Sequence, residues 1–305
     1  MMELSKDKFV IEGKTASDAE AIVRPSLTYW ADAWRRLKKN KLAIISMVIL
    51  IVISLFAIFA PMLSDYDYRT GDLLMTNEAP SSEHWFGTDE LGRDLYVRVW
   101  EGTRISLFIG IVTALLNFTI GVLYGGISGY VGGNVDNIMM RFVEIIFAIP
   151  YLIWVILLTT VMKAGLFSII VALSIAGWGG MARLVRGQIL QIKEMEFVMA
   201  AKTLGADAGR IITKHLIPNT IGVIIVSITF AIPSAIFSEA FLSYIGLGIP
   251  VPEASLGALS KDGTRMLLLE PYQLVFPSVV ISLIMLAFQI FGDGLRDALD
   301  PRLRQ

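Results

Sequence analysis

The sequence predicts an all-α integral membrane protein with six transmembrane helices and an N-terminal interfacial helix. Of its 305 residues, 55% are hydrophobic and 17% are charged, and the mean hydropathy is +0.65. Runs without a charged residue cover residues 42–64, 105–135, 145–162, 164–182, 216–238 and 271–292. Each run is at least as long as the roughly 18–20 residues that a helix needs to cross ~30 Å of hydrocarbon. A soluble protein would have to bury six such helices with almost no polar surface between them, so we exclude that class.

The basic residues of the connecting segments predict the orientation. With the N-terminus on the inner side, the inner segments carry 19 Lys and Arg residues and the outer segments carry 7. Basic residues accumulate on the cytoplasmic side of membrane proteins. We therefore expect both termini and the loop 194–219 in the cytoplasm. The formal net charge of −1 gives no indication of a nucleic-acid partner.

Residues 1–41 are expected to form a cytoplasmic tail followed by an interfacial helix. The tail contains Gly13-Lys14-Thr15, but a phosphate-binding loop would need a glycine where Lys8 stands, so no nucleotide site is predicted. Within residues 26–41, Trp30 and Trp34 lie one helical turn apart among basic residues, which is typical of a helix at the membrane surface.

The rest of the chain divides at its charged segments. The expected parts are a first transmembrane helix at 42–64, an extracytoplasmic segment at 65–104, a five-helix core at 105–293 that includes the loop 194–219, and a cytoplasmic tail at 294–305.

The loop between the fourth and fifth predicted spans contains two short helical patterns. The first runs from Glu196 to Leu204 and the second from about Ala208 to Leu216. Gly205 stands where a glycine commonly ends a helix, and Asp207 stands where an N-cap residue begins the next one. Spacing alone leaves open whether the segment is only a connector between two spans.

This loop resembles the EAA loop of the membrane subunits of binding-protein-dependent ABC importers. In that family the short helix of the loop docks in a groove of a cytoplasmic ATPase. The position before the two alanines, usually acidic in the family, is Met199 here, so no ion pair is carried over from it. The residues that the resemblance assigns to ATPase coupling are Glu196, Ala200, Ala201, Gly205, Arg210, His215, Pro218 and Asn219.

An outer stretch, His84 to Leu107, resembles the outer-loop signature of the second membrane subunit of oligopeptide and dipeptide importers. The matching residues are Gly87, Thr88, Asp89, Gly92, Arg93 and Asp94. Two interpretations are open. The stretch contacts an external binding protein or forms a lid, or it is a folded cap held by pairing among Asp89, Arg93 and Asp94.

Three further stretches resemble the same family. They are Gly177 to Lys193, Ser243 to Gly257, and the C-terminal stretch that begins at Gly292 and ends at Arg302. Together with the two loops above, they imply the fold of a type I ABC importer permease.

Features inside the spans suggest packing sites and candidate pathway residues. Gly121, Gly125 and Gly129 recur every four residues, which favours close helix packing in lipid. Pro150 is expected to kink the third span. Glu144 and Glu239 are ionisable residues within spans, and they either line a pathway or reach headgroups or a neighbouring helix.

Several kinds of chemistry are not encoded. The chain has no cysteine and two histidines without metal-ligand spacing, so neither a disulfide nor a zinc site is expected. No serine lies in a nucleophile-elbow pattern. We therefore predict a non-enzymatic chain without catalytic residues, bound metal or bound cofactor.

The resemblance implies one half of the translocation pathway of an ATP-driven oligopeptide importer in the cytoplasmic membrane of a prokaryote. It implies a heterodimer with a homologous second permease, two cytoplasmic ATPases that hold ATP and magnesium, and an external peptide-binding protein. Members of the same family that import dipeptides, nickel chelates or glutathione remain alternatives. An ion-driven secondary carrier is a more remote one, because neither intramembrane glutamate is central and no repeat relates the two halves.

Overall fold

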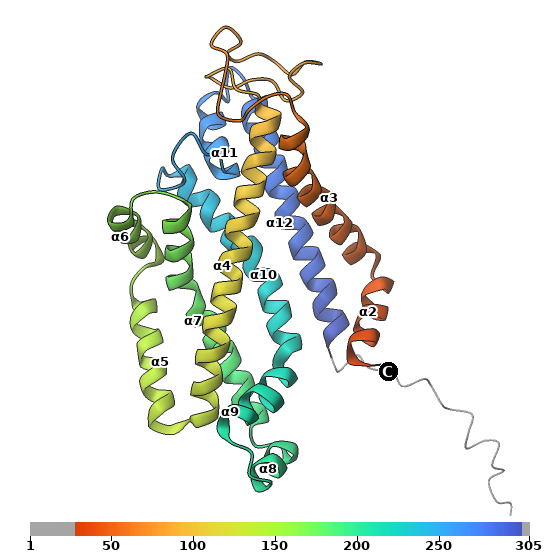
Figure 1. Ribbon diagram of the computed structural model, residues 1–305, viewed down its shortest axis with the longest axis vertical. Helices are drawn as coiled ribbons and strands as arrows, with labels where there is room; N and C mark the ends of the chain where they lie inside the picture. Colours follow the sequence, from red (N-terminus) through yellow and green to blue (C-terminus); the bar gives the residue numbers. More distant parts are fainter. Residues whose placement is uncertain (1–27, 301–305) are drawn as a thin grey trace, which may run out of the picture.

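The computed structural model describes residues 28–300, and the predictions for residues 1–25 and for Arg302 lie outside this range. The helices are α2 (Tyr29–Lys39), α3 (Lys41–Leu63), α4 (Leu95–Val131), α5 (Gly133–Ala148), α6 (Tyr151–Met162), α7 (Leu166–Ile192), α8 (Glu196–Thr203), α9 (Ala208–Arg210), the π-helix η2 (Ile211–Leu216), α10 (Ile217–Tyr244), α11 (Leu256–Arg265) and α12 (Tyr272–Leu299). Figure 1 shows a long bundle with α8 and α9 at one end and the segment between α3 and α4 at the other.

The helix α2 lies within the range predicted for the interfacial helix. The Thr28 hydroxyl accepts a hydrogen bond from the amide of Ala31 and caps the start of the helix. Trp30 and Trp34 are exposed, while Leu37 packs against the end of α12. One face of the helix therefore packs against the protein, and the two tryptophans lie on an exposed face.

Within residues 28–300, five helices are long and apolar enough to cross a membrane, and the pair α5 and α6 brings the number to six if it is one bent span. These two helices are bent by 80° relative to each other, which is a larger bend than a kink within one helix. Proline disfavours helical geometry in the residue before it, and Ile149 before Pro150 is accordingly extended. The predicted kink at Pro150 is a complete break.

The helices α4, α7, α10 and α12 extend beyond the predicted hydrophobic runs by six residues or more. The helix α4 begins at Leu95, ten residues before the predicted start, because the Asp94 side chain caps it by accepting from the amide of Val97 at 2.8 Å. Its first turns are therefore charged and pack under the outer segment. The helix α12 continues to Leu299, beyond the boundary expected at 293.

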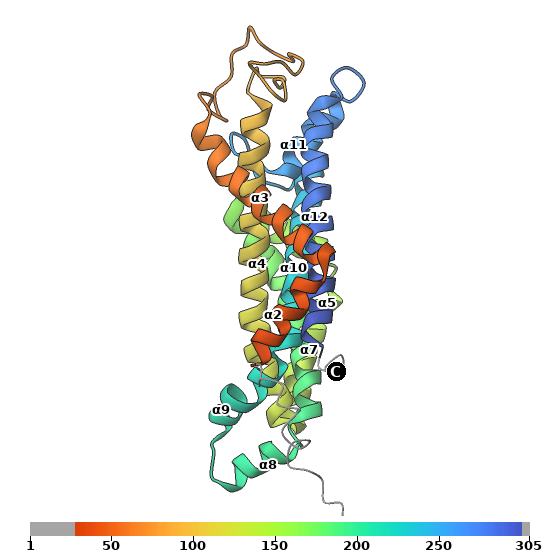
Figure 2. The same ribbon diagram turned by 90° about the vertical axis from the view of Figure 1, so that its right-hand side faces the viewer.

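The centre of the bundle is the contact between α4 and α7, which run side by side in Figures 1 and 2. The predicted glycine repeat lies in this contact. A Cβ atom on Gly121 would meet Met181, one on Gly125 would meet the backbone of Ala182, and one on Gly129 would meet Ile189. The glycines therefore let the two backbones approach closely, as the four-residue repeat predicted.

Gly125→Ala is expected to destabilise the chain by about 1–3 kcal/mol, because the added methyl meets backbone that cannot rotate away. The neighbouring Gly126→Ala is the matched control, since its Cβ would lie 3.5 Å from the Ile212 Cγ2 atom, an ordinary contact. Thermal unfolding of the detergent-solubilised variants, followed by tryptophan fluorescence, measures the difference. Equal melting temperatures for the two variants would contradict the packing role of Gly125.

Candidate functional site

The first half of the candidate site is α8 and the turn that ends it. Gly205 has φ +82°, which a glycine adopts without strain. Its amide donates to the Lys202 carbonyl at 2.9 Å, and the amide of Ala206 donates to the Ala201 carbonyl at 3.0 Å. These two bonds form a Schellman motif, so the predicted glycine stop is confirmed in its geometry.

The second half begins at Asp207, as predicted. Its carboxylate accepts from the amide of Arg210 at 2.9 Å and caps α9. The helix then widens into η2, where the sequence had predicted ordinary α-helix. Pro218 has no amide to donate to the carbonyl of Lys214, and its ring would clash with that carbonyl in a regular helix, so a wider turn relieves both problems.

The buried face of this helix pair is anchored to the bundle. Val198, Ala201, Ile211 and Leu216 are buried, and they share one hydrophobic cluster with Val122 of α4, with Met181, Val185 and Ile189 of α7, and with Ile224 of α10. The Lys202 ammonium lies 5.5 Å from the centre of the Tyr130 ring of α4. A displacement of α8 therefore acts on three membrane helices at once.

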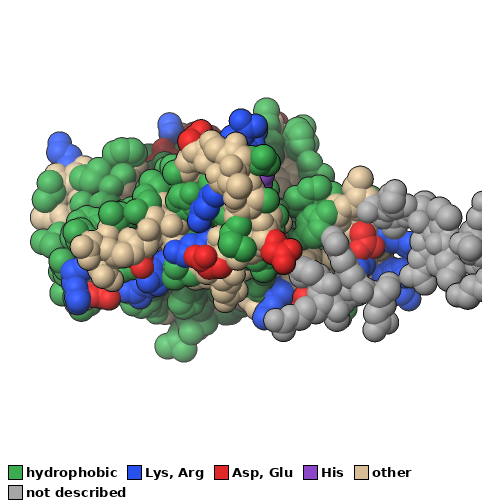
Figure 3. Space-filling model, turned by 90° about the horizontal axis from the view of Figure 1, so that it is seen from below, with side chains coloured by type: hydrophobic (Ala, Val, Ile, Leu, Met, Phe, Trp, Pro, Cys, Tyr) green, Lys and Arg blue, Asp and Glu red, His purple; other side chains and the backbone are tan. Residues whose placement is uncertain are grey.

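The outer face of the pair exposes several large apolar side chains among charged ones. Met195, Phe197, Met199 and Leu204 are exposed, and Leu204 reaches 87%. Figure 2 shows α8 and α9 projecting beyond the bundle, and Figure 3 shows hydrophobic side chains among acidic and basic ones at this end. An exposed apolar group of this kind is typical of a binding surface.

The residues assigned to coupling are thus divided between the two faces. Glu196, Ala200, Gly205, Arg210, Pro218 and Asn219 are exposed, His215 is half-buried, and Ala201 is buried. Asn219 donates from its side-chain amide to the His215 carbonyl at 2.6 Å, across the π-helical turn.

An ion pair that the sequence did not single out braces the same end. Arg186 of α7 donates from Nε and from a terminal nitrogen to the two carboxylate oxygens of Asp136 of α5, at 2.5 and 2.6 Å. The Ser128 hydroxyl of α4 donates to the same carboxylate. The signal available in the sequence was an aspartate and an arginine near the inner ends of two spans.

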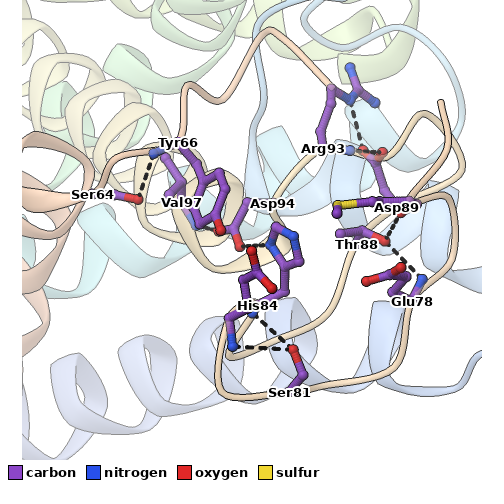
Figure 4. A network of polar contacts seen from close by, with 12 residues as sticks. Ser64, Tyr66, Glu78, Ser81, His84, Thr88, Asp89, Arg93, Asp94 and Val97 are labelled. Carbon is purple, nitrogen blue, oxygen red and sulfur yellow. Dashed lines mark hydrogen bonds and ion pairs between the residues drawn. The ribbon is translucent and has the colours of Figure 1, made fainter. Parts of the chain in front are cut away.

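At the opposite end, the outer-loop signature forms a folded cap (Figure 4). Asp89 accepts from the Arg93 guanidinium at 2.8 Å and from the amides of Leu91 and Arg93. The Arg98 Nε atom lies 3.3 Å from the same carboxylate. Asp94 pairs with His84 at 2.8 Å instead of with Asp89 or Arg93, so the expected pairing among the three is correct only for Asp89 and Arg93.

The cap is closed by glycines and by one buried hydroxyl. Gly87 and Gly92 have positive φ angles of 77° and 68°, and a side chain on Gly92 would meet the backbone of Asp72. Thr88 is fully buried; it donates to the Met75 carbonyl at 2.5 Å and accepts from the amide of Glu78 at 2.8 Å. The signature residues therefore build the fold of this segment, whatever surface it presents to a partner.

An ion pair and a hydrogen bond connect this outer segment to the segment that follows α10. Arg69 donates to Glu253 at 2.8 Å and to the Tyr68 hydroxyl at 2.7 Å. Partial burial raises the pKa of the Tyr68 phenol above its ordinary value, and the negative charge of Glu253 raises it further. The phenol thus stays protonated, and it donates to Glu253 at 3.3 Å.

The two candidate pathway glutamates differ in their surroundings. Glu144 is exposed on α5 and pairs with Arg141 at 2.9 Å. Glu239 is fully buried inside the chain, and its role in lining a pathway stays a prediction. It accepts from Ser106 of α4 at 3.0 Å and from Ser243 at 2.7 Å, and it joins helices as the alternative interpretation had allowed.

A polar pocket that the sequence did not indicate lies between α4, α6, α7 and α10. Its volume is about 250 Å³, and its polar lining residues are Thr113, Asn117, Tyr151, Ser234 and Ser238. These are uncharged residues scattered over three helices, which explains why no spacing in the sequence could reveal them. Among residues 28–300, no group of three His, Cys, Asp or Glu side chains could hold a metal.

Comparison with known proteins agrees with this geometry. The family described as binding-protein-dependent transport system inner membrane component matches residues 120–305, and the N-terminal TM domain of oligopeptide transport permease C matches residues 28–80. The oligopeptide transport system permease protein OppC of Bacillus subtilis is 51% identical over 305 residues, covering 100% of both chains. The dipeptide transport system permease protein DppC of the same organism is 53% identical over 298 residues, covering 97% of this chain and 93% of the relative.

A solved structure shows the same fold. The MetNI methionine ABC transporter, in an inward-facing conformation, matches with a TM-score of 0.56 and 19% identity, over 68% of this chain and 96% of that one. The fold and the family assignment make the chain a multi-pass membrane component of a transport system instead of an enzyme. The chain belongs to the binding-protein-dependent inner membrane components, the permease subunits of ABC importers.

Proposed function

We propose that this chain is one of two permease subunits of an ATP-driven peptide importer, and that α8 with its glycine turn is its docking element for an ATPase. The observation that carries the proposal is the two-faced helix pair. Its inner face is fixed in the hydrophobic cluster with α4, α7 and α10, while its outer face exposes Phe197, Met199 and Leu204.

A peptide substrate is supported by the relatives. Permeases named for oligopeptides and for dipeptides are similar to this chain to nearly the same degree, at 51% and 53% identity. We propose oligopeptides as the substrate, with dipeptides, nickel chelates and glutathione as alternatives. The assembly would contain a homologous second permease, two ATPases that hold ATP and magnesium, and an external peptide-binding protein.

The orientation follows from the distribution of charge. The 19 basic residues of the segments on the α8 side, against 7 on the other, support a cytoplasmic location for both termini and for α8. The cap around Asp89 and Arg93 would then face the external binding protein.

The mechanism we propose is a shift between two conformations. ATP must bind one conformation of the ATPase pair more tightly than the other, and only this difference in affinity can drive the permease. Closure of the ATPases moves α8, and the rigid turn at Gly205 with the cluster around Val198 transmits the movement to α4, α7 and α10. The exposed surface of α8 provides the attachment, and its buried surface provides the stiffness.

Leu204→Lys is expected to reduce co-purification of the ATPases about tenfold or more, because a buried apolar contact at an interface is replaced by a charge. A lysine near the end of a helix does not disturb the helix itself. Leu74→Lys is the matched control, since Leu74 is 91% exposed and Leu204 is 87% exposed, but Leu74 lies in the outer segment.

The measurement is affinity purification of a tagged chain from solubilised membranes, with quantification of the ATPases and of the second permease. The second permease should remain bound to both variants. Recovery of the ATPases in full with Leu204→Lys would contradict the docking surface, and failure of the unmodified chain to bring down any ATPase would contradict the importer itself.

Gly205→Pro is expected to reduce peptide uptake about tenfold or more without preventing membrane insertion, because proline cannot adopt φ +82° or donate to Lys202. Ala201→Asp should act similarly by placing a charge in the cluster around Val198. Gly205→Asn is the control, since asparagine tolerates the left-handed conformation. Uptake of labelled peptide by membrane vesicles is the measurement, and full uptake with Gly205→Pro would refute the role of a rigid turn.

A further inference from the structure

The pocket between α4, α6, α7 and α10 is polar but uncharged. Thr113 and Asn117 come from α4, Tyr151 from the start of α6, and Ser234 and Ser238 from α10. The remaining lining residues are Leu173, Ala176, Gly177, Ala231 and Ala235, so no lining residue carries a charge. The break between α5 and α6 is what places Tyr151 at the pocket.

Among the polar atoms of this pocket that have no hydrogen-bond partner in residues 28–300 are two on α4. The hydroxyl of Thr113 and the side-chain carbonyl oxygen of Asn117 are both buried and make no hydrogen bond, and Thr113 is only 2% exposed. Buried polar groups are nearly always paired in folded proteins. These two groups therefore need a partner that comes from outside the chain, either water or a ligand.

The Asn117 side chain fits at the pocket because residue 177, opposite it on α7, is a glycine. A Cβ atom on residue 177 would collide with the side-chain amide of Asn117, so glycine at that position lets the amide occupy its place at the pocket. The volume of about 250 Å³ exceeds the share of several water molecules in liquid water. It is below the roughly 300–1,000 Å³ of a complete small-molecule site, as expected if a second chain supplies the opposite wall.

We propose that this pocket is a binding site for the backbone amides of the translocated peptide. The inference rests on the proposed function, and it names the chemistry by which this chain contacts its substrate. Hydroxyl and carboxamide groups can donate to and accept from peptide N–H and C=O groups. They offer no countercharge for a charged terminus and no complement to any particular side chain.

This chemistry suits a passage for substrates of varied sequence. Every peptide presents the same backbone groups, so hydrogen bonds to the backbone do not select among side chains. Each bond is individually weak because it replaces a bond to water, and weak binding allows release. The pocket would therefore let different peptides pass, and selection would be left to another component.

The first test uses Thr113→Val in the complete complex, reconstituted into lipid vesicles with its ATPases and binding protein. If the hydroxyl serves the substrate, uptake of a labelled oligopeptide should fall about two- to tenfold in kcat/KM, the worth of one hydrogen bond. The melting temperature should stay the same or rise, because an unpaired buried hydroxyl is removed. Unchanged uptake in a stable variant would overturn the proposal.

Thr119→Val is the matched control on the same helix. Thr119 is exposed, and its hydroxyl donates at 2.8 Å to the Leu115 carbonyl of its own helix. Uptake should match that of the unmodified complex. A loss of uptake equal to that of Thr113→Val would show that removing any hydroxyl from α4 is harmful, and it would overturn the specific role of the pocket.

The second test uses the absence of cysteine from the chain. Ser238→Cys introduces a single thiol at the pocket, and Ser227→Cys introduces one at a half-buried position of the same helix that does not line the pocket. During turnover, transported oligopeptide should slow the reaction of Cys-substituted position 238 with a small neutral maleimide, and it should not slow the reaction at position 227. Reaction at 238 that peptide does not slow would mean that the pocket holds water only, and it would overturn the proposal.

Failure of the proposed function gives a different result. If the unmodified complex takes up no peptide and loaded binding protein does not stimulate its ATPases, then the importer assignment fails before any variant is compared. If the unmodified complex transports peptide and the pocket variants transport equally well, only the pocket is refuted.

Discussion

The close contact between α4 and α7 is the constraint on which the rest of the structure depends. Glycine at three successive turns of α4 brings the two backbones together, and each glycine faces a different part of α7. In lipid there is little hydrophobic gain from helix association, so close packing and hydrogen bonds have to hold the helices. A rigid pair at the centre gives the outer cap, the polar pocket and the α8 element fixed positions relative to one another.

The helix α4 connects these three regions. At its outer end Asp94 caps the helix and pairs with His84. In its middle Thr113 and Asn117 line the pocket. Near its inner end Ser128 donates to Asp136, and Tyr130 lies under Lys202 of α8. A movement received at α8 therefore has a continuous packed route to the pocket along α4.

The buried charges are concentrated in structural roles at the ends of the bundle. Asp89 with Arg93 and Arg98 holds the cap, and Asp136 with Arg186 joins α5 to α7. Removing one partner of such a pair leaves an uncompensated buried charge and is strongly destabilising. Glu239 also has a structural role, but its partners are the neutral hydroxyls of Ser106 and Ser243. The pocket, in contrast, is lined by neutral groups, which bind a passing amide without retaining it.

The sequence by itself determined the helical membrane class, most of the spans, and the local geometry of the α8 turn. These features depend on composition over some twenty residues or on one glycine and one capping aspartate, and such local signals are readable without a structure. The family resemblance was equally local, since its motifs are continuous stretches.

Only the tertiary structure decided which polar residues meet. Arg186 and Asp136 are fifty residues apart, Glu239 and Ser106 are 133 residues apart, and the pocket draws on four helices. No periodicity links positions on different helices, so neither the burial of Glu239 nor the choice of His84 as the partner of Asp94 could be predicted. The break at Pro150 was predicted in place but not in size, because the 80° angle depends on the packing of α6 against α7.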